Sequence, residues 1–280
     1  MDRLLLVDGS NLLFQMFYGM PARIVNHEGK AIHGTLGFVG ALLKIIRMTK
    51  PTHAAVLFDG ENVNERTQID ENYKANREDY SQMPEEETPF FQLPDIYAAL
   101  DWMGIAHAET TECETDDWMA AYALQYGVEH EVIIASQDSD FFQLITDHVT
   151  VLRYRGEKSV FCDPVYIRDK LGIEPSLYAD HKSLTGDGSD NIRGAERIGP
   201  KTATALLNEY GSLESIISQV KSVKRDYIRD SIEKNTERLR KNYQLIKLNG
   251  GAELPFDPVE LEYSCPNITT TDVLKGIGLR

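Results

Sequence analysis

The stretch Arg3-Leu4-Leu5-Leu6-Val7-Asp8 opens the chain with a short, continuously apolar run that ends at an aspartate. Two later stretches repeat this arrangement, at residues 54–58 directly before Asp59 and at residues 131–135 closely before Asp138. Short apolar runs separated by helical stretches are typical of parallel strands that are buried on both faces. We therefore expect an α/β fold in which a central, mostly parallel sheet carries helices on both faces.

The segments between these runs, and the second half of the chain, place apolar residues at the spacing of one helix face. The predicted helices cover residues 34–48, 93–103, 116–125, 201–208, 213–220 and, as a long helix, about 224–248. We expect the α/β core to occupy residues 1–180, with an irregular, arch-like segment at about 70–94. Residues 181–280 are expected to be an all-helical region that ends in an irregular tail after Asn249.

The 280 residues have the composition of an ordinary globular protein. The three cysteines, Cys113, Cys162 and Cys265, lack the spacing of a zinc site, and a sparse, odd count fits a reducing compartment. The first residues do not have the pattern of a secretory signal, and no stretch approaches the roughly 18 apolar residues that span a bilayer. We therefore expect a soluble, cytoplasmic protein that does not enter a membrane.

The net charge of −15 argues at first against a nucleic-acid partner. Its distribution is more informative than its total, because residues 191–249 carry 12 Lys and Arg against 7 Asp and Glu, a local balance of +5. The acidic excess therefore lies largely before that region. An acidic total is compatible with DNA binding when the acids are gathered around cations.

Nine carboxylates fall in five short segments, three of which follow the predicted strands. They are Asp8; Asp59; Glu114, Asp116 and Asp117; Asp138 and Asp140; and Asp187 and Asp190. Parallel strands bring their carboxyl ends to one edge of a sheet, where ligands bind. Thr115 is expected to cap the helix after the third segment. The last pair, at i and i+3, is expected on one face of a helical turn.

A single aspartate is ordinarily a turn or cap residue, but nine acids cannot gather without counter-charge, because each buried unpaired carboxylate is costly. Ligation by oxygen alone favours Mg²⁺ or Mn²⁺, whereas His or Cys ligands would be expected at a zinc site. Two such ions roughly 4 Å apart stabilise the attacking and leaving oxygens of a phosphodiester displacement. The carboxylates therefore predict phosphodiester hydrolysis with two Mg²⁺, for which Mn²⁺ can substitute.

Five ordered motifs carry a resemblance to a known family. They are Leu6-Val7-Asp8-Gly9, Phe58-Asp59-Gly60, Glu114-Thr115-Asp116-Asp117, Asp138-Ser139-Asp140-Phe141-Phe142-Gln143-Leu144 and Thr185-Gly186-Asp187-Gly188-Ser189-Asp190-Asn191. From about residue 3 to residue 217 the chain resembles the 5′ nuclease (flap endonuclease) family, which includes the N-terminal domain of bacterial DNA polymerase I. Because no polymerase segment follows, we expect the stand-alone form. The resemblance implies a PIN-like core, a monomer, and cutting of branched or 5′-ended DNA as a 5′-3′ exonuclease or flap endonuclease.

The resemblance also implies a division of the carboxylates between two cations. Asp8, Asp59, Glu114 and Asp116 would hold the first metal, and Asp116, Asp138, Asp140 and Asp187 the second. Asp117 and Asp190 would lie in or near the outer shell. The family usually has Ala where this chain has Thr115.

Basic and aromatic residues near the arch-like segment are expected to hold nucleic acid. Arg66 and Tyr73-Lys74-Ala75-Asn76-Arg77 resemble the base of the family's helical arch. Lys74 and Arg77 can stabilise charge on the scissile phosphate, which makes them catalytic candidates beside Asp8 and Asp59. Tyr73 can stack on an unpaired base, and Lys182 resembles a family lysine that faces substrate.

A second nucleic-acid element is expected at residues 194–203, which resemble a helix-hairpin-helix (helix-3-turn-helix) of this family. A glycine turn that enters a helix presents backbone N–H groups to a phosphate, and such contacts hold duplex without reading its sequence. The residues expected to bind DNA here are Gly194, Ile198, Gly199, Lys201 and Thr202. Arg197 stands where the family has Gly. Whether this hairpin binds K⁺ is therefore an open question.

Three other functions fit parts of the pattern. A PIN-type ribonuclease shares the acids at the strand ends, but such domains are shorter and lack the helix-hairpin-helix. A phosphatase with an aspartate nucleophile needs a second Asp two residues after the first, where this chain has Ser10. A non-catalytic protein that binds branched DNA would be favoured by the loss of a ligand, and none of the nine acids is missing.

Overall fold

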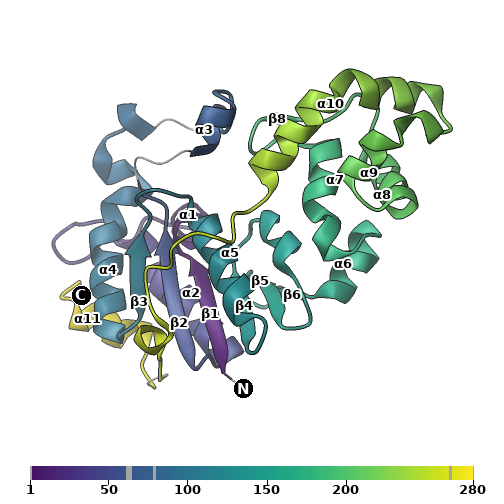
Figure 1. The fold of residues 1–280 in the computed structure, drawn as a ribbon. Helices are drawn as coiled ribbons and strands as arrows, with labels where there is room; N and C mark the ends of the chain where they lie inside the picture. The colour runs from purple at the N-terminus through teal and green to yellow at the C-terminus, as the bar shows by residue number, and fades with distance from the viewer. Residues whose placement is uncertain (1, 61–64, 78–79, 265–266, 280) are drawn as a thin grey trace.

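The computed structural model describes residues 2–60, 65–77, 80–264 and 267–279. They form an α/β body around a six-stranded sheet, with a helical region beside it (Figure 1). The strands are β1 (Arg3–Asp8), β2 (His53–Phe58), β3 (Ala106–Glu109), β4 (Glu131–Ala135), β5 (Val149–Arg153), β6 (Val160–Cys162), β7 (Gly186–Asp187) and β8 (Ile192–Arg193). The α-helices are α1 (Gly9–Gly19), α2 (His33–Thr49), α3 (Glu65–Ile69), α4 (Leu93–Met103), α5 (Thr115–Tyr126), α6 (Pro164–Leu171), α7 (Tyr178–Thr185), α8 (Pro200–Tyr210), α9 (Leu213–Ser218), α10 (Asp226–Ile246) and α11 (Thr270–Gly276).

The sheet has the strand order β3-β2-β1-β4-β5-β6, in which the first five strands are parallel and β6 runs antiparallel to β5. The three apolar runs of the sequence form β1, β2 and β4, with β1 hydrogen-bonded to both of the others. The prediction of a mostly parallel sheet is therefore confirmed. Strands β3, β5 and β6 extend it on either side and were not predicted.

Both faces of the sheet are buried by helices, as the apolar runs predicted. Successive side chains of a strand point to opposite faces. Leu4 and Leu6 of β1 join the core under α5, whereas Leu5 and Val7 join a second core with Phe38 of α2. Helices α1, α2 and α4 form that second layer (Figure 1).

The helical region contains the predicted helices as α8, α9 and α10, but it is not all-helical. Strands β7 and β8 pair in an antiparallel ladder, so Asp187 lies in a strand and Asp190 in the turn that follows. The predicted helical turn for this pair is therefore wrong. Gly186 has φ +84, and a Cβ there would lie 2.5 Å from the backbone nitrogen of Gly194. Two glycines thus allow the backbones to meet as a ladder.

Among its described residues, the arch-like segment at about 70–94 contains short helical turns at Tyr80–Gln82, Glu85–Glu87 and Pro89–Gln92, before α4 begins at Leu93. Its residues 78 and 79 lie outside the described residues. The predicted division at residues 180 and 181 falls within α7. Within the described ranges, the structure has no helix that is both long and apolar enough to cross a membrane.

The tail after Asn249 returns from α10 to the α/β body (Figure 1). The hydroxyl of Tyr122 donates to the carbonyl of Phe256 at 3.0 Å. The tail then ends in α11, which packs against α2 and α4, so the prediction of a wholly irregular tail is wrong. A capping box begins this helix, because the side chains of Thr269 and Asp272 each accept from the other's backbone N–H.

Candidate active site

Asp8, Asp59 and Asp138 lie at the same edge of the sheet, because β1, β2 and β4 are parallel neighbours. Asp8 caps α1, with Oδ1 accepting from the amide of Asn11 at 2.9 Å and Oδ2 from the hydroxyl of Ser136 at 2.8 Å. Burial, together with the charge of Asp59, raises the pKa of Asp8 to about 7. The edge therefore holds carboxylates that repel one another.

Helix α5 adds carboxylates to this edge. The amide of Thr115 donates to Oδ1 of Asp59 at 3.0 Å. Glu114 is the cap residue and Thr115 the first helical residue, so the predicted cap role of Thr115 is wrong. Burial and then the charge of Asp138 raise the pKa of Asp116 well above its ordinary value, with Asp59 contributing in the same direction.

Asp138 and Asp140 share the turn after β4. The amide of Asp140 donates to Oδ1 of Asp138 at 2.8 Å. Burial and then the charge of Asp138 raise the pKa of Asp140, and Asp187 and Asp190 raise it further. Its Oδ1 is buried and has no hydrogen-bond partner among the described residues. Asp140 therefore stands between the carboxylates of the sheet and those of the helical region.

Asp187 and Asp190 face this edge from the helical region, each beside a cation. Lys182 of α7 forms an ion pair with Asp187, and Arg77 lies 3.1 Å from Asp190. Although burial opposes it, the bond from Lys182 holds the pKa of Asp187 below its ordinary value. The Arg77 side chain is 55% exposed, so it also faces solvent.

The donor set of this site fits divalent cations. All of its side-chain donors are carboxylate oxygens, the ligand type that Mg²⁺ and Mn²⁺ prefer. The pKa values of Asp8, Asp116 and Asp140 are raised, and Oδ1 of Asp140 has no hydrogen-bond partner among the described residues. Positive charge placed among these carboxylates would lower their pKa values and stabilise their ionised forms. In the present arrangement, no three His, Cys, Asp or Glu side chains of the described residues stand close enough to enclose an ion. Lysines supply part of the counter-charge instead.

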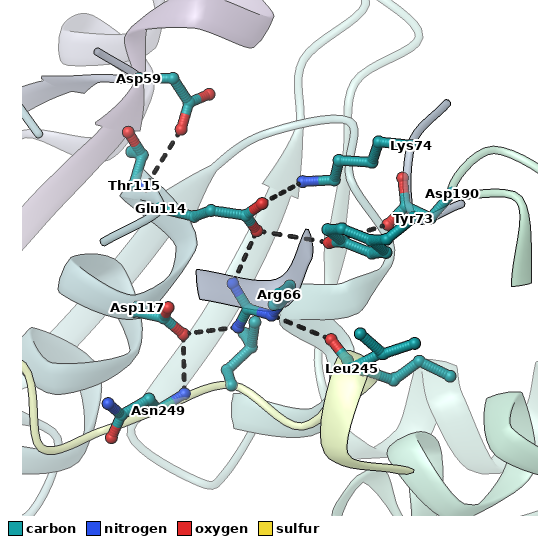
Figure 2. Close-up of polar contacts among 12 residues, drawn as sticks. Asp59, Arg66, Tyr73, Lys74, Glu114, Thr115, Asp117, Asp190, Leu245 and Asn249 are labelled. Carbon is teal, nitrogen blue, oxygen red and sulfur yellow. Dashed lines mark hydrogen bonds and ion pairs between the residues drawn. The ribbon is translucent and has the colours of Figure 1, made fainter. Parts of the chain in front are cut away.

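Arg66 of α3 is a buried cation at the side of the cluster (Figure 2). Its guanidinium donates to Glu114 at 2.6 Å, to Asp117 at 2.7 Å and to the carbonyl of Leu245 at 2.9 Å. Arg66 is only 7% exposed, which differs from the expected contact with DNA. It instead joins the arch base, α5 and the end of α10.

Tyr73 and Lys74 complete this buried group (Figure 2). The Tyr73 hydroxyl lies 3.3 Å from Glu114, and the residue is only 6% exposed. This burial differs from the expectation that Tyr73 stacks on an unpaired base. Lys74 Nζ donates to Oε1 of Glu114 at 2.9 Å. Although burial opposes it, Glu114 and then Asp116 raise the pKa of Lys74. Lys74 is therefore held charged beside the carboxylates.

The backbone around Lys74 is fastened to the turn that carries Asp190, a link that the sequence did not reveal. The amide of Lys74 donates to the carbonyl of Asp190 at 3.1 Å. Asn76 donates to the carbonyl of Gly188 at 2.9 Å, and Asn191 to the carbonyl of Asn72 at 2.9 Å. Because these residues are more than 100 positions apart, only the folded chain shows that they pair.

The predicted hairpin places Gly199 at the cap of α8, with Lys201 exposed in the first turn and Thr202 half-buried. Ile198 is only 4% exposed and packs in the core, which differs from the expected contact with DNA. A Cβ at Gly194 would lie 2.3 Å from the backbone of the preceding helix, so this glycine allows close packing. The backbone of Arg197 lies in the left-handed region, with a φ of +65.

Comparisons with known proteins place this geometry in a family. The family model described as the 5′-3′ exonuclease N-terminal, resolvase-like domain matches residues 3–172, and that of the 5′-3′ exonuclease C-terminal SAM fold matches residues 173–269. DNA polymerase I of Rhizobium leguminosarum is 34% identical over 264 residues, which cover 91% of this chain and 25% of that protein. The thermostable DNA polymerase I of Thermus aquaticus is 32% identical over 256 residues, covering 91% of this chain and 29% of that protein. The chain thus spans between a quarter and a third of the length of these relatives.

Solved structures share the fold. The complex of the bacteriophage T5 D15 flap endonuclease with DNA and metal ions has a TM-score of 0.72 and 23% identity, covering 98% of this chain and 99% of that chain. The catalytic core of Rad2 in complex with a DNA substrate has a TM-score of 0.61 and 14% identity, covering 99% of this chain and 91% of that chain. With both of its parts matched by the family models, this chain belongs to the 5′-3′ exonuclease family.

Proposed function

We propose that this protein hydrolyses phosphodiester bonds in 5′-ended or branched DNA, as a 5′-3′ exonuclease and flap endonuclease that depends on Mg²⁺ or Mn²⁺. The observation that carries the proposal is that seven carboxylates, from five segments, lie near enough to influence one another's pKa at the edge of the sheet and the facing turn. They are Asp8, Asp59, Asp116, Asp138, Asp140, Asp187 and Asp190. Such a crowded set is costly without counter-ions. The flap endonuclease and Rad2 structures with similar folds contain DNA, which supports the substrate class.

The carboxylates would share two divalent cations. Asp8, Asp59, Glu114 and Asp116 would hold one, and Asp116, Asp138, Asp140 and Asp187 the other. Asp117 and Asp190 would act from outside these sets, where Asp117 is paired with Arg66 and Asp190 with Arg77. When bound, such cations supply an activated water and stabilise the leaving oxygen of a phosphodiester.

The remaining groups position the substrate and compensate its charge. Lys74 and Arg77 approach the carboxylate edge from the arch base and would meet the charge that develops on the scissile phosphate. Lys182 of α7 adds a third cation, paired with Asp187. Arg66 and Tyr73 are buried and would hold Glu114 in place rather than touch DNA.

The hairpin would hold the duplex away from the site of cleavage. Lys201 is exposed in the first turn of α8, where its ammonium group and the positive end of the helix dipole suit a backbone phosphate. Contacts of this type position duplex without reading bases. The predicted K⁺ at this hairpin, the cytoplasmic location and the monomeric state stay predictions.

A cleavage assay with a 5′-flap duplex tests the proposal. We expect cleavage in Mg²⁺ or Mn²⁺, none in excess EDTA, and none by Asp140→Asn, which should still bind the flap. Asp147→Asn is a matched control, because Asp147 is exposed in the following loop. Undiminished cleavage in EDTA, or by Asp140→Asn, would contradict the two-metal proposal.

A further inference from the structure

The two proposed cations differ in where their ligands come from. All four ligands of the first cation belong to the α/β body, where they follow β1 and β2 or adjoin the start of α5. The second set is divided, because Asp116, Asp138 and Asp140 belong to the body whereas Asp187 lies in β7 of the helical region. The spacing of the second set therefore depends on contacts that fix the helical region against the body.

Gln143 makes one such contact, from the turn that follows β4. It is only 7% exposed, and its Nε2 donates to the carbonyls of Asp140 and of Ile246 in α10, both at 3.0 Å. Its Oε1 accepts from the amide of Leu248 at 3.1 Å. Three hydrogen bonds of one buried amide group thus fasten the turn that carries Asp140 to the end of α10.

Asn242 makes the corresponding contact with the helical region, one turn earlier in α10. It is only 4% exposed, and its Nδ2 donates to the carbonyls of Ser183 in α7 and Arg193 in β8, both at 3.0 Å. Asp187 lies between these two residues in the chain, in the ladder that β7 forms with β8. Asn242 therefore holds both ends of the segment that carries Asp187.

The end of α10 is thus a common anchor for both halves of the second set. A buried backbone group that loses its partner is costly, so the chain around it moves until another partner replaces the bond. Mg²⁺ tolerates little movement, since it requires near-octahedral oxygens at about 2.0–2.1 Å. The first set is spaced independently of this anchor, by the pairing of β1 with β2 and the bond from Thr115 to Asp59.

We propose that Gln143 and Asn242 are positioning residues for the second cation, because they anchor the turn of Asp140 and the strand of Asp187 to the same end of α10. Both act through the backbone of the segments that carry the ligands, and neither is itself a ligand. The proposal rests on the proposed function, which divides the carboxylates between two cations. It requires a selective effect on one cation, whereas loss of folded protein would affect both.

Mn²⁺ binding by the full chain without DNA tests the proposal and requires no cleavage. Electron paramagnetic resonance of free Mn²⁺ follows the titration, and we expect the parent to bind two equivalents. Gln143→Met and Asn242→Ala should each weaken one equivalent at least about tenfold, as loss of a group that orients a ligand does, and leave the other unchanged. The two variants act on separate segments, so each tests the proposal alone if the other does not fold.

Asn235→Ala is the matched control. Asn235 is a buried amide of the same helix, 8% exposed, but its Nδ2 donates to Ser231 and Glu196 and to neither segment that carries the ligands. The control should lose a similar free energy of unfolding in urea and keep both Mn²⁺ equivalents. Parental affinity for both equivalents in the two variants overturns the proposal, as does the same weakening in Asn235→Ala. A parent that binds only one equivalent overturns it as well.

Single-turnover cleavage of a 5′-flap duplex gives a second readout. The Mg²⁺ concentration for half-maximal rate should rise about tenfold in both variants, and excess Mg²⁺ should restore the rate. An unfolded fraction would instead lower the rate at every Mg²⁺ concentration, which would overturn the proposal. Cleavage by the parent is scored separately. Its absence contradicts the proposed function, whereas parental cleavage with an unchanged Mg²⁺ dependence in both variants overturns the positioning roles alone.

Discussion

Lys74 Nζ lies 2.9 Å from Glu114 Oε1, and both side chains are largely buried, at 13% and 9% exposure. Lys74 reaches this position from a left-handed backbone, with φ +56, that is held by the carbonyl of Asp190. A non-glycine residue in this region costs about 1 kcal/mol or more, so the surrounding contacts must fix it there. The pair joins the arch base to the carboxylates on which the proposed hydrolysis depends.

Replacement of Lys74 tests whether this cation acts on the transition state. Lys74→Ala should lower kcat and kcat/KM together by about 10²–10³, as loss of one preorganised donor does, with KM little changed. Single-turnover kinetics on a 5′-flap duplex measure the effect. Lys44→Ala, which removes an exposed lysine of α2, is the control. A raised KM with a normal maximal rate would leave Lys74 as an electrostatic anchor only.

The crowded carboxylates predict an unusual pH dependence for the metal-free protein. The folded protein raises the pKa of Asp8 from 3.8 to about 7, through burial and then Asp59. A group with a raised pKa binds its proton more tightly in the folded state than in the unfolded state. The contribution of Asp8 to the free energy of unfolding is therefore fully present below about pH 4 and is lost as the pH rises through 7. The melting temperature in EDTA should therefore fall between pH 5 and pH 8, and Mg²⁺ should restore it at pH 8.

Asp8→Asn separates this charge effect from the helix cap. Asn can accept the bond from Asn11 that caps α1, but it carries no charge. The variant should therefore melt at a higher temperature than the parent in EDTA at pH 8, with little difference at pH 4. It should also lose most of the gain from Mg²⁺ and nearly all cleavage. A variant that melts lower than the parent at pH 8 would show that Asp8 is not repelled by its neighbours.

Replacement of Arg66 should lower the stability of the fold rather than the affinity for DNA. Removal of one partner from a buried ion pair costs about 3–5 kcal/mol, because the remaining charge is left uncompensated. Arg66→Met leaves Glu114 and Asp117 without their shared cation, so the free energy of unfolding in urea should fall by about that amount. Arg240→Met, at an exposed pair with Glu214, should change little. Similar losses of unfolding free energy for both variants would show that Arg66 contributes no more to stability than an exposed ion pair does.

The sequence predicted the strands that are buried on both faces, β1, β2 and β4, because each of them is an unbroken apolar run. It did not predict β3, whose sequence Ala106-His107-Ala108-Glu109 is half-buried and has no apolar run. The sequence did not predict helix α11, because it lies in a tail that contains several prolines and glycines. Its capping box, Thr269 with Asp272, was the one local signal that could have indicated it.

The acidic residues of the candidate site could be found because strand ends and motifs are local patterns. Their partners could not, since Arg66 binds the carbonyl of Leu245, 179 positions away. The same distance in sequence explains why Arg66 and Tyr73 were expected to face DNA. A basic or aromatic residue beside a motif looks accessible until the packing of α10 against α3 is known.

Arg197 predicts opposite effects on stability and on binding. Its φ of +65 favours glycine, so Arg197→Gly should raise the free energy of unfolding by about 1 kcal/mol. Its side chain is exposed in the hairpin beside Lys201, so the same change should weaken duplex binding whatever the sequence. The slope of log K against log[salt] should become shallower by about 0.9, as for one lost phosphate contact. Lys201→Ala should match this slope change without the gain in stability. Anisotropy across a salt series and urea unfolding measure the two effects, and an unchanged slope for Arg197→Gly would remove Arg197 from the interface.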